Sequence, residues 1–247
     1  MVDTMIQVQP ASTWEAWGLV LPTPGSDSCP LCHSWNDEPS RVCATCSAAQ
    51  AELHTLAQLL PISLFAKPSL MRDALTEYKS AGGGRHAEAL AALLRAFLDC
   101  HADAVVEYFG CAWDVVTPVP STRGRLGQAV ARVGQGAGLQ VNQLLHWTGT
   151  VGQHRRYDLP LFAAKPEAEG RRVLLLEDAY VSGARSQTAA ATLSSAGALA
   201  VGILALGRRV NPDFNDCSRL FWGRRASGSG SMGGGFQWLT IPEPGPA

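Results

Sequence analysis

The sequence predicts an α/β protein in which helices flank a parallel sheet and a small zinc-ribbon or zinc-knuckle element precedes it. Two apolar runs, 173–176 and 198–207, have the length of buried strands in a parallel sheet. Segments with apolar residues at helical spacing lie between the expected strands, which is the order typical of such folds. Two C-x2-C pairs stand near the N-terminus.

Length and composition suit one α/β domain with a small appendage. The chain has 247 residues, of which 46% are hydrophobic and 17% charged, so it can build a core. The net charge of −1 disfavours strongly electrostatic nucleic-acid binding outside a local patch. No stretch approaches 18 consecutive apolar residues, and no basic segment precedes an apolar core at the N-terminus. We therefore expect a cytoplasmic protein without a membrane span.

The expected organisation has four parts. A lead-in covers residues 1–28, and a zinc-binding element with a helix covers 29–60. The α/β domain covers 61–225, and a flexible tail covers 226–247, with one edge strand at 236–241. Trp14, Trp17 and Leu19 in the lead-in are expected to cover part of the domain.

Four of the seven cysteines have the spacing of a structural zinc site. Each C-x2-C turn brings two thiolates to one side, and two such turns complete a tetrahedral shell for Zn²⁺. An Fe–S centre, a redox pair and plain buried cysteines are the alternatives, and His33 could displace one ligand. Because four protein ligands leave no position for substrate, the expected role is structural. The ligands are Cys29, Cys32, Cys43 and Cys46.

Helical spacing predicts three helices before the next strand. They cover residues 47–60, ended by Pro61, then 70–79, then 86–97 with a continuation towards 109. The glycines at 82–84 are expected to cap a helix and act as a hinge. The alternative, a phosphate-binding loop, is disfavoured because no strand is expected before it.

A turn with anion-binding groups follows the next expected strand, 113–119, and precedes a helix at 126–133. Hydroxyls and backbone N–H groups can ligate a pyrophosphate there, and two arginines can neutralise it. A solvated basic turn is the alternative. The residues of this predicted pyrophosphate site are Pro120, Ser121, Thr122, Arg123 and Arg125.

A second site is predicted where the apolar run 173–176 ends. Glu177 and Asp178 follow directly, then a turn containing Ser182 and Gly183, and then a helix. The carboxyl edge of an open α/β sheet binds ligands, and a helix N-terminus favours phosphate. Since carboxylates repel phosphate, these two should accept hydrogen bonds from hydroxyls. A phosphorylated sugar supplies both groups.

Residues 173–185 resemble the phosphoribosyl-pyrophosphate (PRPP) motif of type I phosphoribosyltransferases. The resemblance implies that Glu177 and Asp178 hold the ribose hydroxyls and that the following turn holds the 5′-phosphate. Two departures stand out: Ala179-Tyr180 replaces a branched aliphatic pair, and Val181-Ser182 replaces Thr-Thr. Arg185 and Ser186 could compensate for the missing hydroxyl. The implied 5′-phosphate-binding residues are Ala179, Tyr180, Val181, Ser182, Gly183, Ala184 and Arg185.

Over residues 29–209, three features occur in the order found in the ComF family, which the chain therefore resembles. They are the four-cysteine element, the Pro-Val-Pro turn that begins the predicted pyrophosphate site, and the PRPP motif. Residues 74–94 also resemble that family, in which a Lys and a Gly come just before a helix, whereas 124–128 is shorter and lacks its Asn. The resemblance implies Mg²⁺ bound with PRPP and ribose-5-phosphate transfer to a nitrogen nucleophile, or binding without turnover. The alternative is an accessory role in competence-type DNA uptake, with single-stranded DNA or a competence helicase as partner.

The segment 134–166 lies where type I phosphoribosyltransferases carry a mobile hood that shields the ribosyl centre from water. An irregular surface connection is the alternative. Beyond the PRPP motif, Arg208 and Arg209 are placed just after a strand and are expected to face solvent. The hood residues that match the family are Gln153, Arg156 and Phe162, with Asp158 near the expected Asn.

Overall fold

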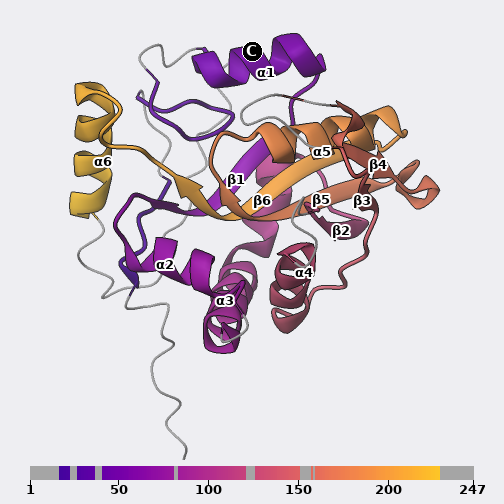
Figure 1. Ribbon diagram of the computed structural model, residues 1–247, viewed down its shortest axis with the longest axis horizontal. Helices are drawn as coiled ribbons and strands as arrows, with labels where there is room; N and C mark the ends of the chain where they lie inside the picture. Colours follow the sequence, from indigo (N-terminus) through magenta and orange to yellow (C-terminus); the bar gives the residue numbers. More distant parts are fainter. Residues whose placement is uncertain are drawn as a thin grey trace, which may run out of the picture.

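A four-stranded parallel sheet forms the centre of the protein. The computed structural model describes residues 17–22, 27–36, 41–80, 83–120, 126–150, 157 and 159–228. The strands have the order β1-β6-β5-β2 (Figure 1). Parallel pairing joins each neighbouring pair, and the two inner strands are almost fully buried. The strands are β1 (Gln58–Phe65), β2 (Val115–Pro118), β5 (Arg172–Tyr180) and β6 (Ala200–Arg209).

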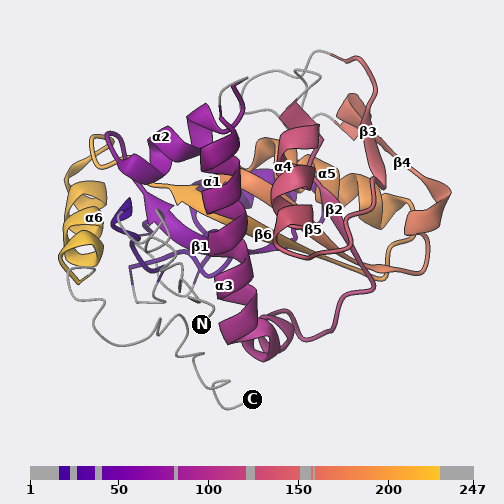
Figure 2. The ribbon, with the colours of Figure 1, turned by 90° about the horizontal axis from the view of Figure 1, so that it is seen from below.

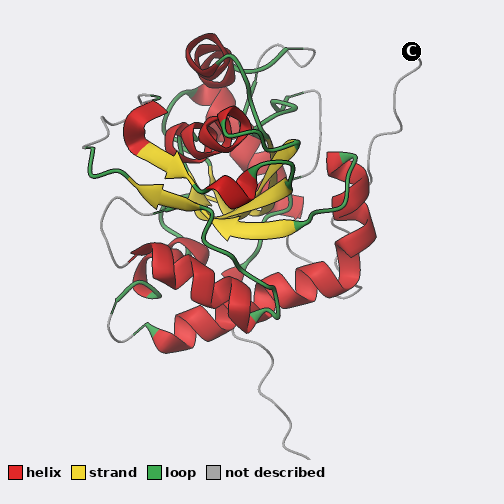
Figure 3. Ribbon diagram, turned by 90° about the vertical axis from the view of Figure 1, so that its right-hand side faces the viewer, coloured by secondary structure: helices red, strands yellow, loops and turns green. Residues whose placement is uncertain are grey.

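Helices cover both faces of this sheet, so that the domain has three layers (Figure 3). The helices α2, α3 and α4 pack on one face through a core that includes Leu90, Leu94 and Leu174 (Figure 2). The other face carries α5 and the cysteine element with α1, around Val173, Leu175 and other buried residues. The helices are α1 (Ala44–Leu53), α2 (Leu70–Glu77), α3 (Gly84–Phe109), α4 (Leu126–Gly136) and α5 (Ala184–Ser195).

The predicted fold class is confirmed: a parallel sheet is flanked by helices, and a four-cysteine cluster stands near the N-terminus. The expected helices at 70–79, 86–109 and 126–133 are present with small shifts of their ends. Trp17 and Leu19 are buried in the core, as expected. Among the described residues, no helix has both the length and the apolar character needed to cross a membrane.

The expected helix at 47–60 is wrong in its second half. The helix α1 ends at Leu53 because His54 adopts the left-handed conformation with φ of 58°. Residues from Gln58 onward form β1, with Pro61 inside the strand. Because β1 lies at the edge of the sheet, with β6 as its strand neighbour, a proline without an N–H is tolerated there. The leucine-rich run before Pro61 therefore forms a strand, although its apolar spacing also fits a helix.

A small antiparallel hairpin lies within the described part of the hood segment. It consists of β3 (Leu145–Trp147) and β4 (Phe162–Ala164), with short 3₁₀ turns at Leu159–Leu161 and Pro166–Ala168. The predicted hood residues Gln153, Arg156 and Asp158 lie outside the described residues, as do Trp14 and the expected edge strand at 236–241.

A further helix, α6 (Asp216–Gly228), was not predicted from the sequence. Its Phe221 is fully buried against Leu64 and Val210. The helix therefore includes the first residues of the expected flexible tail.

Candidate functional site

The carboxyl edge of the sheet places Pro120, the first residue of the predicted pyrophosphate turn, beside the strand that carries the acid pair. The strands β2 and β5 are paired up to Pro118 and Leu176, and the Val119 N–H donates to the Leu176 carbonyl at 3.0 Å. Pro120, which is buried, therefore lies beside the end of β5 that carries the acid pair. The remaining predicted pyrophosphate residues, Ser121, Thr122, Arg123 and Arg125, lie outside the described residues.

Glu177 is buried at the end of β5 and bonded by the first turn of α5. Ser186 Oγ donates to its Oε2 at 2.8 Å, and Arg185 Nη2 lies 3.2 Å from its Oε1. Burial raises the pKa of Glu177 to about 7, although the Arg185 charge opposes this rise. Arg185 and Ser186, which could compensate for the missing hydroxyl of the phosphate-binding turn, thus bind the Glu177 carboxylate instead.

Asp178 is buried beside Glu177 and is bonded by two residues that follow α2. Tyr78 Oη donates to Asp178 Oδ2 at 2.9 Å, and the Lys79 ammonium forms an ion pair with the same oxygen. Burial works to raise the pKa of Asp178, but the Lys79 charge and the hydrogen bonds to Glu177, Lys79 and Tyr78 together outweigh it and hold the pKa below its usual range.

Sequence analysis did not assign Tyr78 or Lys79 to the site. They lie about a hundred positions from Asp178, and no local pattern reports that contact. The available signal was the lysine that precedes a helix in the ComF-like stretch.

The turn between β5 and α5 has the geometry of an anion-binding cradle. Gly183, at the N-cap of α5, has a φ of 79°, which glycine adopts without strain. The first N–H groups of a helix have no intrahelical acceptors, so they can bind an anion. Ser182 Oγ lies 3.4 Å from the Ala184 N–H, and Val181 is 43% exposed on the turn.

Tyr180 lies directly beneath this turn. Its ring is buried, and its hydroxyl accepts a hydrogen bond from Gln187 Nε2 at 3.2 Å. A Cβ added at Gly183 would lie 2.8 Å from Tyr180 Cε1 and closer still to its Cζ and Oη. Glycine is therefore required at position 183 for two reasons: the backbone angle and the ring below it.

Arg208 does not face solvent, so its predicted exposure is wrong. The residue lies inside β6, is 6% exposed, and its guanidinium carbon stands 5.2 Å from the centre of the Tyr180 ring. Its donors bind the Val181 carbonyl and the Cys32 carbonyl of the cysteine element. Val181 belongs to the turn at residues 181–183, which we call the phosphate turn because it is part of the predicted 5′-phosphate site. A local reading of the sequence does not reveal these contacts.

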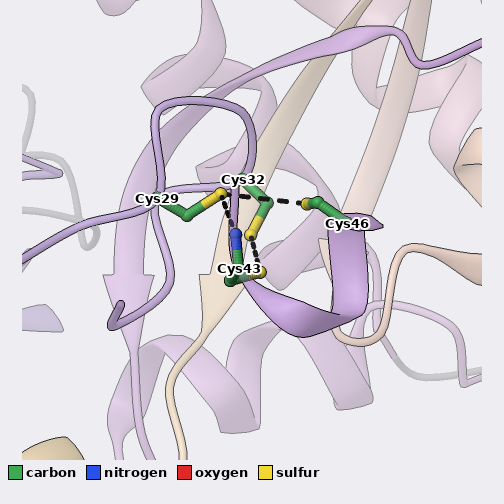
Figure 4. Close-up of side chains that lie close together, drawn as sticks. All are labelled: Cys29, Cys32, Cys43 and Cys46. Atoms are coloured by element: carbon green, nitrogen blue, oxygen red, sulfur yellow. Dashed lines mark hydrogen bonds between the residues drawn. The ribbon is translucent and has the colours of Figure 1, made fainter. Parts of the chain in front are cut away.

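The four cysteines converge as a single metal site (Figure 4). All four Sγ atoms lie within 4.8 Å of one another, and two of the separations are 3.9 Å and 3.7 Å. Zn–S bonds of about 2.3 Å in a tetrahedron place neighbouring sulfurs about 3.8 Å apart, which matches. A cluster of several irons would hold the thiolates farther apart. The residues fit one Zn²⁺ ion bound by Cys29, Cys32, Cys43 and Cys46.

His33, which could displace a cysteine ligand, is held elsewhere. Its Nε2 lies 3.0 Å from the Leu59 carbonyl and 2.9 Å from Tyr108 Oη. Burial lowers the pKa of His33 to about 4, so the ring is neutral near pH 7. The imidazole joins the cysteine element to β1 and α3 and leaves the four thiolates as the ligand set.

A cavity of about 550 Å³ lies between α3 and α4 on the opposite face of the sheet. Small residues line most of it, and Arg95 and Arg132 also reach it. Tyr78 forms part of its wall while its hydroxyl bonds Asp178. The tyrosine thus separates the acid pair from this space.

Comparison with known proteins adds little to the geometry. No family model matches the sequence, and no curated protein does. A solved structure described as the allosteric regulatory enzyme of purine biosynthesis is similar over 47% of this chain, at 23% identity and a TM-score of 0.30. The similarity covers 26% of that chain. At this score it supports no conclusion about function, which therefore depends on the residues described above.

Proposed function

We propose that the protein is a cytoplasmic, ComF-type relative of the type I phosphoribosyltransferases and that it binds PRPP at the carboxyl edge of its sheet. The observation that carries the proposal is the join of β5 to α5. Two adjacent carboxylates lie near the end of the buried strand, two residues before it ends at Tyr180, and a glycine turn then leads into a helix N-terminus. The carboxylates suit ribose hydroxyls, and the helix N-terminus suits the 5′-phosphate.

The predicted pyrophosphate turn completes a site for the whole ligand. It starts at Pro120, next to the end of β5, so a ligand bound across both segments would span ribose and pyrophosphate. Mg²⁺ would enter with PRPP and neutralise its pyrophosphate while keeping several of its own waters.

In the transfer reaction, the bond between ribose C1 and the pyrophosphate oxygen breaks and pyrophosphate leaves with the electron pair. A nitrogen lone pair then forms the new bond to C1, and that nitrogen loses a proton. Glu177 and Asp178 would hold the ribose in place, and Ser121, Thr122, Arg123 and Arg125 would stabilise the departing anion. Catalysis of this kind rests on positioning and electrostatics and needs no covalent nucleophile.

Binding without turnover is the second candidate, and the internal partners of the acid pair favour it. Each carboxylate already has partners within the protein: Lys79 and Tyr78 for Asp178, and Arg185 and Ser186 for Glu177. A ribose must displace some of these donors, which costs binding free energy and orders the site around the ligand. A sensor of PRPP needs no more than this.

Calorimetric titration of PRPP with Mg²⁺ into the wild type and Asp178→Asn tests the proposal. We expect saturable binding by the wild type and at least a tenfold loss in the variant, because the ribose acceptor is weakened. Asp114→Asn is the matched control, since Asp114 is exposed and pairs with Arg172 at the opposite end of β5. No binding by folded wild type, or equal binding by Asp178→Asn, would contradict the proposal. A screen of amines and bases for pyrophosphate release then separates transfer from binding alone.

The accessory role in DNA uptake depends on the ComF resemblance. Its candidate contacts with single-stranded DNA, Arg123 and Arg125, lie outside the described residues. Salt-dependent retention of single-stranded DNA that is lost in Arg123→Ala/Arg125→Ala would support it. An absence of retention at low salt would remove DNA and leave a protein partner, such as a competence helicase, to be sought by the same double variant.

A further inference from the structure

The guanidinium of Arg208 is buried where the cysteine element meets the phosphate turn. Its Nε donates to the Cys32 carbonyl at 2.9 Å, and its Nη2 lies 3.9 Å from Cys32 Sγ. Its Nη1 donates to the Val181 carbonyl at 2.7 Å and lies 3.3 Å from the Tyr180 carbonyl. One side chain thus contacts a metal ligand and the first residues of the turn.

Irregular alternation along β6 directs Arg208 to this position. Leu206 packs in the core beneath α2 and α3, and a Cβ at Gly207 would meet Phe65 and Leu75 of the same core within 3 Å. Leu206 and Gly207, two successive positions of β6, therefore both face the helical layer that contains α2 and α3. The next side chain turns to the opposite face, where the cysteine element and Tyr180 lie.

The partners of Arg208 are backbone carbonyls, a sulfur and an aromatic ring. Within the described part of the chain, no carboxylate forms an ion pair with it. A Zn²⁺ ion with four thiolates carries a net negative charge, so the buried guanidinium supplies the opposite charge beside it. The metal site and the turn are therefore stabilised by the same cation.

A second connection joins the same parts. The Gln187 side chain accepts a bond from the Ala57 N–H at 2.9 Å and donates to the Ala57 carbonyl at 2.8 Å. Its amide also bonds the Tyr180 hydroxyl beneath Gly183. The segment after α1 is thereby fixed to the floor of the turn, so the cysteine element and the turn form one packed unit.

We infer that Arg208 is a positioning residue that couples the metal state of the four-cysteine element to ligand affinity at the phosphate turn. The inference rests on the proposed function, because it concerns the same 5′-phosphate site. Loss of the metal would release Cys32, and with it the position of the guanidinium that holds the Val181 carbonyl. The turn would then have to be ordered by the ligand, which lowers affinity.

The coupling is reciprocal. A metal that strengthens ligand binding by some factor has its own affinity raised by the ligand by the same factor. We expect a factor of about ten, the size of one hydrogen bond from a charged donor. Ribose 5-phosphate is the suitable probe, because it engages the phosphate turn without pyrophosphate and without added Mg²⁺.

The experiment measures zinc affinity by chelator competition, with and without saturating ribose 5-phosphate, in full-length wild type and Arg208→Met. Ribose 5-phosphate should tighten zinc binding about tenfold in the wild type and have little effect in Arg208→Met. Arg209→Met is the matched control, since it removes the same charge one position along β6, and it should behave as the wild type does. Arg208→Lys, which keeps a cationic donor, should restore part of the effect.

The outcomes separate this inference from the proposed function. If the wild type binds neither PRPP nor ribose 5-phosphate, the proposed function fails first. If it binds them but ribose 5-phosphate leaves zinc affinity unchanged, the coupling is refuted. A purely structural role for Arg208 would weaken zinc and ligand separately and leave their mutual effect intact, which also refutes the inference. Should Arg208→Met fail to fold, Arg208→Lys and the wild-type measurement decide.

Discussion

The glycine at the phosphate turn gives the sharpest test of the site's geometry. Gly183 adopts a φ of 79°, and its missing side chain leaves room for the Tyr180 ring. In Gly183→Ala, the left-handed conformation costs about 1–2 kcal/mol. The added methyl overlaps a buried, hydrogen-bonded ring, and such overpacking costs about 1–3 kcal/mol more. We therefore expect a total loss of about 2–5 kcal/mol in the free energy of unfolding.

A matched variant separates the two costs. Gly170 also has a positive φ, of 69°, but a Cβ there would meet nothing within 4 Å. Gly170→Ala should therefore lose only the backbone part, about 1–2 kcal/mol. The difference between the two variants measures the contact with Tyr180.

Denaturant unfolding of zinc-loaded protein, monitored by circular dichroism, supplies these free energies. Tyr180→Val provides the second arm of a double-mutant cycle, because valine removes the ring that the new methyl would strike. Gly183→Ala should cost about 1–3 kcal/mol less in that background than in the wild type. An equal cost in both backgrounds, or a cost no greater than that of Gly170→Ala, would refute the reasoning.

Two further predictions concern the acid pair and the metal. Burial raises the pKa of Glu177 from 4.5 to about 7, so its contribution to stability is complete below pH 4.5 and is lost as pH rises through 7. Glu177→Gln should remove about 3 kcal/mol of pH dependence between pH 4.5 and 8 in denaturant titrations, and an unchanged slope would contradict the raised pKa. Metal analysis of protein purified without chelators should find one zinc per chain, and Cys46→Ser should weaken zinc binding by at least about 100-fold. Cys217→Ser, at an exposed cysteine outside the cluster, should leave zinc content unchanged.

The parts of the site that were predictable are those set by short-range patterns. An apolar run that ends in two acids and a glycine predicts a strand, a turn and a helix, because each preference acts over a few residues. The cysteine cluster was predictable for the same reason, since C-x2-C turns already place pairs of thiolates together.

The parts that were missed depend on contacts between distant segments. Arg208 bonds the carbonyl of Cys32 across 176 positions, and a charged residue near a strand end ordinarily faces water. The spacing of the leucine-rich run before Pro61 predicts a helix, because spacing alone does not reveal an edge strand, where a missing N–H is tolerated. Whether a polar side chain such as Arg208 is buried depends on how distant segments pack around it, so the neighbouring sequence does not predict it.

The partners of the acid pair show how this edge of the sheet holds two adjacent carboxylates. Two carboxylates at the end of a buried strand repel each other and lose hydration, so an empty site of this kind is costly unless cations approach it. Lys79, just after α2, and Arg185, in the first turn of α5, supply those charges, one for each acid. Under the proposed function, a ribose that displaced Lys79 from Asp178 would release the ammonium beside a ligand rich in phosphate, where its charge would again be favourable. The lysine, which pairs with the carboxylate here, would then pair with the anion in the complex.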